Sequence, residues 1–156
     1  MRPMTRLAAL GVAAAVVLAA CGTASAPAAT KRTIHMTALE YKGSTEVARE
    51  PFPVAAVPGG GGYILKEPKD GKWETSTYRW EPGTIVVYQG DEVELRIWGV
   101  NGAEHPGRIE GYEEAFSVKR GQLTTVSFIA SKPGVFRILC DVHNPSMTGT
   151  LVVLAR

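Results

Sequence analysis

ILCDVHNPSMTG, residues 138–149, contains a cysteine, a histidine and a methionine within eight positions. The stretch follows an alternating run in which Ile138 takes the same side as Cys140. Because successive side chains of a strand point to opposite faces, the sulfur of Cys140 is predicted to point into the protein at the end of a strand. The short loop after it brings His143 and Met147 around the same point. A thiolate, an imidazole and a thioether are therefore predicted to lie together.

The rest of the chain indicates an all-β protein. Short segments alternate between apolar and polar residues and are separated by glycine, proline and aspartate turns. In the best example, Val93, Leu95 and Ile97 point one way and their neighbours point the other. No amphipathic helix is predicted. This pattern favours a sandwich or barrel of antiparallel sheets. Strands are predicted at 33–41, 76–80, 84–88, 92–100, 122–130, 135–139 and 150–155, with a turn at 42–44 and a short further strand at 63–65.

Sulfur ligands combined with imidazole suit copper in both oxidation states. A trigonal set of two histidines and one cysteine, with a weak axial methionine, is the arrangement of electron-transfer copper sites. Such a site needs a second imidazole from elsewhere in the chain. His105 follows the predicted strand 92–100 and is the best candidate, whereas His35 is interpreted as an ordinary strand residue.

Together these features resemble the cupredoxin family, and the resemblance covers most of residues 84–155. It is carried by the ordered ligand set and by QGDEV (89–93), KPGVF (132–136) and GTLVV (149–153). The resemblance implies a Greek-key β-sandwich or barrel of the cupredoxin type that binds one copper ion. It also implies the roles of the ligands: equatorial nitrogens from His105, in an upstream loop, and His143, the thiolate from Cys140 and the axial thioether from Met147.

Several features of the site leave alternatives open. Met147 is also interpretable as a core side chain, as most methionines are, and His105 as a surface loop residue. The spacing Cys-x2-His-x3-Met falls between the tighter and looser versions of blue copper loops. Pro106 stands where blue copper proteins have a backbone N–H that donates to the cysteine sulfur, and proline has no N–H. A binuclear centre is excluded because this loop carries one cysteine.

The N-terminus reads as a targeting segment. Arg2 and Arg6 precede an uncharged apolar stretch at 7–20, which is too short to span a bilayer comfortably. The stretch ends in LAAC, which resembles the lipobox of bacterial lipoproteins and predicts lipidation of Cys21; the alternative is an ordinary secretory signal. The predicted organisation is a signal peptide at 1–20, a flexible tether at 21–32 and a cupredoxin domain at 33–156 with a Pro/Gly-rich insertion at about 50–72.

Charge and cysteine content limit which partners and which cellular compartment are expected. Removing the leader lowers the number of basic residues from 17 to 15, against 15 acidic residues, so the mature protein is neutral and nucleic acid is not an expected partner. If Cys21 is acylated, Cys140 is a lone thiol in an oxidising compartment, for which metal ligation is the simplest reason. We expect an exported monomer, lipid-anchored at the periplasmic or extracellular face of a membrane.

Four functions compete at this stage. The leading hypothesis is a non-enzymatic electron carrier that cycles between Cu(I) and Cu(II) with a redox partner protein. The second is a copper chaperone or sequestering protein that delivers Cu(I) to a copper-receiving protein such as an oxidase. A red-copper or oxygen-handling enzyme is third, because no acid/base pair is identifiable. A metal-free adhesion domain is the weakest.

Overall fold

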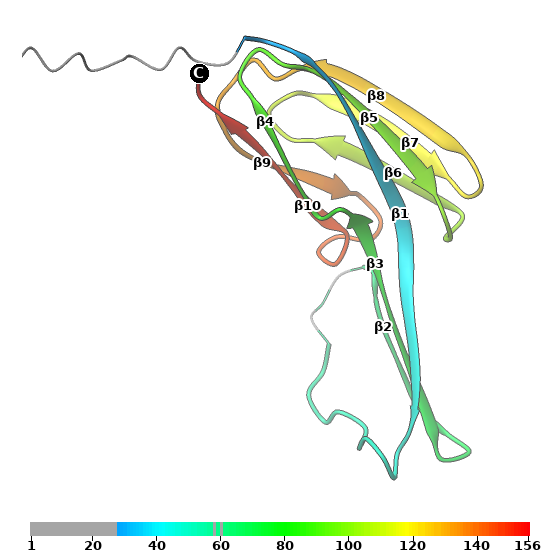
Figure 1. Ribbon diagram of the computed structural model, residues 1–156. Coiled ribbons are helices and arrows are strands. Elements are labelled where there is room, and N and C mark those ends of the chain that lie inside the picture. The colour runs from blue at the N-terminus through cyan, green and yellow to red at the C-terminus, as the bar shows by residue number, and fades with distance from the viewer. Residues whose placement is uncertain (1–27, 58, 60) are drawn as a thin grey trace, which may run out of the picture.

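The computed structural model describes residues 28–57, 59 and 61–156, so that the predicted signal peptide and Cys21 lie outside the described residues. The described chain is all-β and forms two five-stranded sheets (Figure 1). No helix among these residues is long and apolar enough to cross a membrane. The strands are β1 (Lys31–Glu46), β2 (Tyr63–Lys69), β3 (Lys72–Glu81), β4 (Thr84–Tyr88), β5 (Glu92–Gly99), β6 (Glu104–Ile109), β7 (Glu114–Lys119), β8 (Leu123–Ile129), β9 (Gly134–Cys140) and β10 (Thr148–Leu154).

The two sheets form a sandwich. One sheet has the strand order β2-β3-β1-β5-β8 and the other β4-β10-β9-β6-β7. Most neighbours are antiparallel, but β1 pairs with β5 and β10 with β4 in parallel. Parallel neighbours need a long connection, and in both pairs the chain visits other strands in between. The all-β sandwich is confirmed, whereas the expectation of wholly antiparallel sheets is wrong at these two pairs.

Alternate residues of both sheets form one core. In β5, Val93, Leu95 and Ile97 have no exposed surface, whereas Trp98 is 47% exposed, which confirms the predicted orientation of this strand. Burying one such aliphatic side chain contributes roughly 1.5–3 kcal/mol. The core also contains Met36, Ala38, Trp80, Ile85, Val87, Ile109, Val118, Val126, Phe128, Ala130, Ile138, Leu151 and Val153.

The region expected to be mostly loop contains a β-ribbon. β1 does not turn at residues 42–44 but stays paired with β3 as far as Glu46. The described part of residues 50–62 forms no named strand, as predicted for most of the insertion at 50–72, but the second half of the insertion contains β2 and the β2–β3 turn. At that turn Asp70 and Gly71 have φ values of 52° and 74°, which suits an Asp-Gly hairpin. Pairing with β3 therefore overrides the turn composition of residues 42–44.

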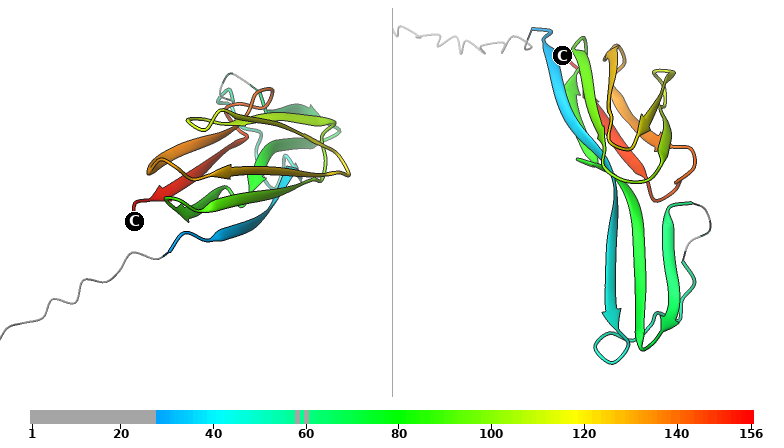
Figure 2. Two further views of the ribbon diagram at one scale, coloured as in Figure 1. Left: turned by 90° about the horizontal axis from the view of Figure 1, so that it is seen from above. Right: turned by 90° about the vertical axis from the view of Figure 1, so that its right-hand side faces the viewer.

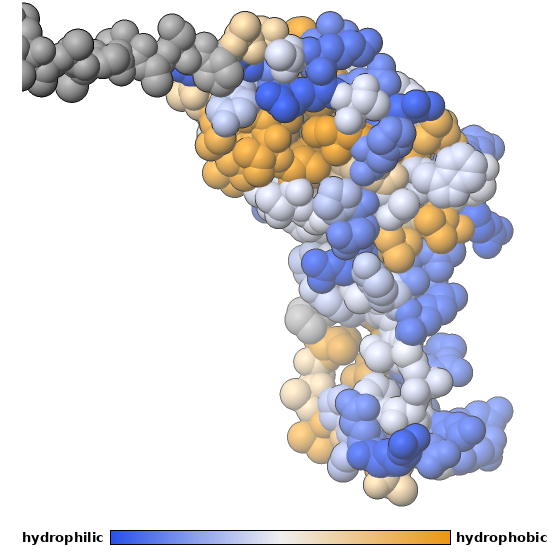
Figure 3. Space-filling model, viewed as in Figure 1, coloured by the Kyte–Doolittle hydropathy of each residue, from blue (hydrophilic) through white to orange (hydrophobic). Residues whose placement is uncertain are grey.

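We call residues 41–77, as far as they are described, the arm. The arm projects beyond the sandwich (Figure 2), and its visible face is largely hydrophilic, whereas apolar residues gather over β4, β9 and β10 (Figure 3). Trp73 is buried and its ring lies edge-on to Phe52, with 5.8 Å between the ring centroids. Its Nε1–H donates to the carbonyl oxygen of Glu50 at 2.9 Å. These contacts hold Glu50 and Phe52 against β3.

Asp91 fastens both ends of the described chain to the sandwich. Its buried carboxylate accepts hydrogen bonds from the backbone N–H groups of Thr30 and Tyr88, at 3.0 and 2.9 Å. It also pairs with Arg32, in β1, and with Arg156 at the C-terminus. Burial acts to raise the pKa of Asp91, but these donors outweigh it and hold the pKa far below its ordinary value of 3.8. β1 accordingly begins at Lys31, two residues before the predicted start.

Replacing this carboxylate is predicted to destabilise the domain. Because the pKa of Asp91 is lower in the folded than in the unfolded protein, its stabilisation is present above pH 3.8 and is lost on acidification. Asp91→Asn should lower the melting temperature at pH 7 by on the order of 10 °C, measured by circular dichroism. The difference from wild type should shrink toward pH 3.

Glu92→Gln is the matched control. Its carboxylate is 57% exposed and lies 3.6 Å from the ammonium group of Lys31, and exposed pairs contribute little to stability. Equal melting temperatures for the Asp91 variant and the wild-type protein at pH 7 would contradict the role assigned to Asp91.

Candidate metal centre

Three of the four predicted ligand residues meet at one end of the sandwich. The ligand atoms of His105, Cys140 and His143 all lie within 4.8 Å of one another. The Nδ1 atom of His143 lies 3.2 Å from Nδ1 of His105 and 3.4 Å from Sγ of Cys140. The two imidazoles and the thiol thus converge on a common point.

Pairing of β6 with β9 brings residues far apart in sequence to this point. Gly107 lies opposite Cys140 in the ladder, and the backbone N–H of Asp141 donates to the carbonyl oxygen of Pro106 at 2.8 Å. His105, two residues before Gly107, therefore shares its face of the sheet with Gly107. His105 is a residue of β6, which corrects the expectation that it lies in a loop. The proline-containing sequence around it concealed this strand.

The environment of His105 determines which of its nitrogens is available. The imidazole has no exposed surface, and its Nε2 lies 2.8 Å from the carbonyl oxygen of Asn101. A carbonyl oxygen only accepts hydrogen bonds, so Nε2 carries the hydrogen and, in the neutral ring, Nδ1 carries a lone pair. That lone pair points toward His143. A hydrogen bond of this kind is what orients a metal-binding imidazole.

Cys140 is a buried thiol at the end of β9 and is the free cysteine among the described residues. Burial raises its pKa, while hydrogen bonds from the backbone N–H groups of His143 and Val142 act in the opposite direction. Those donors come from the loop that follows the cysteine. Pro106 has no N–H and adds no donor to them.

His143 is half-buried, and its ring packs face to face on Tyr78, with 3.9 Å between the centroids and 14° between the planes. Burial lowers its pKa below the ordinary value, and the charge of His105 lowers it further, while the charge of Glu40 acts in the opposite direction. A lowered pKa keeps the imidazole neutral near pH 7. Its lone pair is then available to a metal.

Met147 closes the loop by its backbone and lies inside the protein. Its N–H donates to the carbonyl oxygen of His143 at 2.8 Å, and its carbonyl oxygen accepts from the N–H of Cys140 at 3.1 Å. The side chain has no exposed surface and belongs to the same core cluster as Cys140. Both interpretations of Met147, as axial ligand and as core side chain, are consistent with this placement.

Gly61 and Gly62, which precede β2, lie against the loop between β9 and β10 at 141–147, the ligand loop, a role that composition alone does not assign. The N–H of Gly61 donates to the carbonyl oxygen of Asn144 at 2.8 Å. A Cβ at Gly61 would lie 2.1 Å from the carbonyl oxygen of Val142, and one at Gly62 would lie 1.8 Å from Oγ of Ser146. Within the glycine run at 59–62, Gly61 and Gly62 are the described positions at which close backbone approach requires glycine.

Comparisons with known proteins agree with this architecture. Two curated relatives, both named cytochrome c oxidase subunit 2 and both from Thermus thermophilus, are 30% identical over 80 residues, or 49% of this chain. The chain spans about half the length of these relatives, since the match covers 58% of one and 47% of the other. No protein-family model matches.

The structural comparison concerns the fold. Copper nitrite reductase from Nitrosomonas europaea is similar with a TM-score of 0.52 and 16% identity, over 81% of this chain and 42% of that one. Together with the two-sheet topology, this likeness shows that the fold is of the cupredoxin type.

Gly62→Ala is predicted to disturb the centre from outside it. The new Cβ would meet Ser146 and, at 2.8 Å, the carbonyl oxygen of His143, so the ligand loop must move. We expect copper affinity to fall about tenfold or more in a competition titration, as it does when residues around metal ligands are changed.

Gly121→Ala is the matched control for this variant. Gly121 has a similarly positive φ of 74°, against 86° at Gly62, but a Cβ there meets nothing within 4 Å. Both variants therefore carry the backbone strain of a left-handed conformation, roughly 1–2 kcal/mol. Equal copper affinities in the two variants would contradict the proposed contact.

Proposed function

We propose that this protein is a mononuclear copper protein that carries electrons and is not itself an enzyme. In this proposal His105, Cys140 and His143 hold the ion, and Met147 is a weaker fourth ligand. The observation that carries the proposal is the convergence of two imidazole nitrogens and one thiol within 4.8 Å in a largely buried place.

The donor set fits copper. Two imidazoles and a thiolate in a trigonal arrangement, with a thioether nearby in sequence, form the set of electron-transfer copper sites. When bound, copper supplies a one-electron couple between Cu(II) and Cu(I). The protein contributes a fixed geometry, because Asn101 orients His105 and the loop bonds of Met147 restrain His143. A preset geometry limits the rearrangement that accompanies each electron transfer.

The number of ions and the absence of catalysis are supported by separate features. Cys140 offers one thiolate, and Cys21 is proposed to be acylated, so a bridged pair of ions lacks its second sulfur. The acidic neighbours of the ligands have other partners: Glu104 accepts a hydrogen bond from Ser117 at 2.6 Å, and Asp141 pairs with Arg108. Both carboxylates are exposed. Neither is placed as a proton donor or acceptor in a closed site.

The names of the similar proteins also support redox chemistry. Two relatives are subunits of cytochrome c oxidase, and the structural neighbour is a copper nitrite reductase. In this chain the exposed surroundings of His143 include Pro145 and Val142, which is 53% exposed. We propose that a redox partner protein docks over this small apolar surface, since transient redox encounters use small interfaces.

The first described residues and the metal centre lie at opposite ends of the sandwich (Figure 1). Thr30 contacts Asp91 in the β4–β5 turn, whereas Cys140 lies at the far end of β9. A lipid on Cys21 would therefore hold the monomer at the periplasmic or extracellular face of a membrane and leave the copper end accessible.

Cys140→Ser is predicted to abolish the signature of the site. Copper-loaded wild-type protein should show an intense thiolate-to-Cu(II) absorption band and a narrow copper hyperfine splitting by electron paramagnetic resonance. The variant should lose both, because serine provides no thiolate. Firm Cu(I) binding that needs Cys140, without a coloured Cu(II) form, would favour copper delivery. Absence of binding of either ion would overturn the proposal.

Met147→Leu separates the two interpretations of the methionine. Leucine keeps the apolar volume, so the free energy of unfolding of the metal-free protein should change by less than roughly 1.5 kcal/mol. If Met147 is the axial ligand, the absorption band should persist while the reduction potential changes, measured by voltammetry. An unchanged potential would identify Met147 as a core residue only.

A further inference from the structure

Tyr78 is an aromatic residue in contact with both imidazoles. It lies in β3, in the sheet opposite the ligand strands, and its ring stacks on His143 at 3.9 Å between centroids. The same ring approaches His105 at 5.4 Å and a 56° tilt. A face-to-face stack leaves the imidazole of His143 little freedom to rotate. The ring of Tyr78 thus restricts the orientation of the His143 imidazole.

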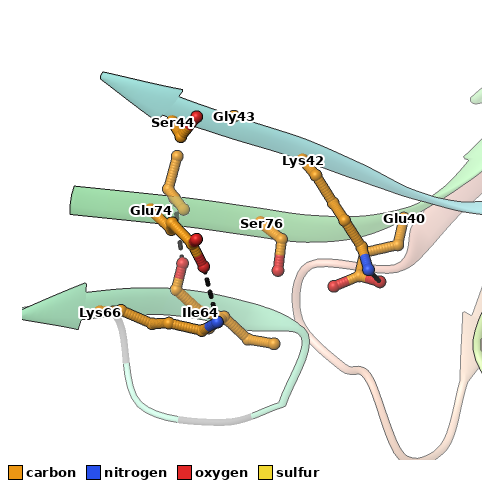
Figure 4. Close-up of a pocket in the computed structure, with 9 residues that line it drawn as sticks. Glu40, Lys42, Gly43, Ser44, Ile64, Lys66, Glu74 and Ser76 are labelled. Carbon is orange, nitrogen blue, oxygen red and sulfur yellow. Dashed lines mark hydrogen bonds and ion pairs between the residues drawn. The ribbon is translucent and has the colours of Figure 1, made fainter. Parts of the chain in front are cut away.

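Glu40 is the cross-strand neighbour of Tyr78. The two residues are opposite each other in the β1–β3 ladder, and burial together with the charge of Glu40 raises the pKa of the Tyr78 hydroxyl. The Glu40 side chain is 8% exposed and lies 3.0 Å from the ammonium group of Lys42. Figure 4 shows Lys42 beside Glu40 at the end of a groove on the arm. Burial acts to raise the pKa of Glu40, but hydrogen bonds, including those from Ser76 and Lys42, lower it overall.

Asn101 connects the same position to the other imidazole. Its side-chain oxygen accepts from the N–H of Glu40 at 2.6 Å, and its side-chain N–H donates to the carbonyl oxygen of Glu40 at 3.2 Å. Its own carbonyl oxygen accepts from Nε2 of His105. Glu40 is therefore indirectly connected to both imidazoles. It pairs across the ladder with Tyr78, which stacks on His143, and its backbone binds Asn101, which binds His105.

We propose that Tyr78 is a positioning residue for the metal centre: its ring fixes the imidazole of His143 and thereby sets the balance between the two oxidation states. This inference rests on the proposed copper function. Cu(II) requires the full ligand set, whereas Cu(I) accepts fewer ligands. A fixed His143 keeps the geometry suited to Cu(II) after reduction and limits movement during electron transfer.

Tyr78→Leu should release the imidazole. We expect the ratio of Cu(II) to Cu(I) affinity to fall about tenfold, which raises the reduction potential by about 59 mV for a one-electron couple. Electron self-exchange, measured by nuclear magnetic resonance on the copper-loaded full-length protein, should slow about tenfold. Tyr78→Phe keeps the ring, so its reduction potential and self-exchange rate should stay close to those of the wild-type protein.

The matched control is Tyr41→Leu. Tyr41 is the neighbour of Glu40 in β1 and is 47% exposed, so it points away from the buried side of the strand. This variant should keep the potential and the exchange rate of the wild-type protein. Thermal unfolding of the metal-free variants shows whether each one is folded.

A metal-free readout separates this inference from the copper function. Stacking on Tyr78 should shift the ring protons of His143 upfield, and the shift should vanish in Tyr78→Leu and persist in Tyr78→Phe. Copper binding with an unchanged potential and exchange rate in Tyr78→Leu would overturn the role of Tyr78 alone. If the wild-type protein does not bind copper but shows the expected ring-proton shifts, the copper function is overturned. Only the stacking of Tyr78 on His143 then remains.

Discussion

The hydrogen bond from Nε2 of His105 to the carbonyl oxygen of Asn101 is the contact on which the candidate metal centre depends. A fully buried imidazole is costly unless its polar atoms have partners. This bond satisfies one nitrogen and leaves the other as a lone pair aimed at His143 and Cys140. The side chain of Asn101 also binds both backbone groups of Glu40, so the same residue joins the centre to the opposite sheet.

The centre lies between the two sheets, and each sheet contributes something different. β6, β9 and the loop after β9 provide the nitrogen and sulfur donors, whereas β3 provides aromatic walls. Tyr78 stacks on His143, and the ring of Trp80 approaches His105 edge-on at 6.3 Å. Part of β3 belongs to the arm, and Gly61 of the arm donates a hydrogen bond to the carbonyl oxygen of Asn144 in the ligand loop. The arm and the centre are therefore parts of one packed unit.

Much of the sandwich was predictable because its strands have one buried and one exposed face. The alternation in β5 and the inward side of Cys140 were both predicted correctly, since a period of two is local information. β6 was missed because Pro106 and Gly107 lie within it, and β7 because it is short, with Phe116 and Val118 as its residues packed in or against the core. In the arm, the short strand predicted at 63–65 lies in β2, but the extension of β1 was missed because that strand continues through Gly43, which only pairing with β3 makes extended.

The sequence by itself determined the fold class and the chemical types of the candidate ligands, because alternation and residue identity do not depend on long-range contacts. It did not determine which nitrogen of His105 is available, what supplies hydrogen bonds to the sulfur, or what restrains His143. Asn101 and Val142 are near the ligands in the chain, but Asn101 is held by the backbone of Glu40 in β1, and Tyr78 reaches His143 from the opposite sheet. Only the tertiary structure decided these features, because the contacts of Glu40 with Asn101 and of Tyr78 with His143 join residues distant in the chain and exist only after the strands pair and the sheets pack.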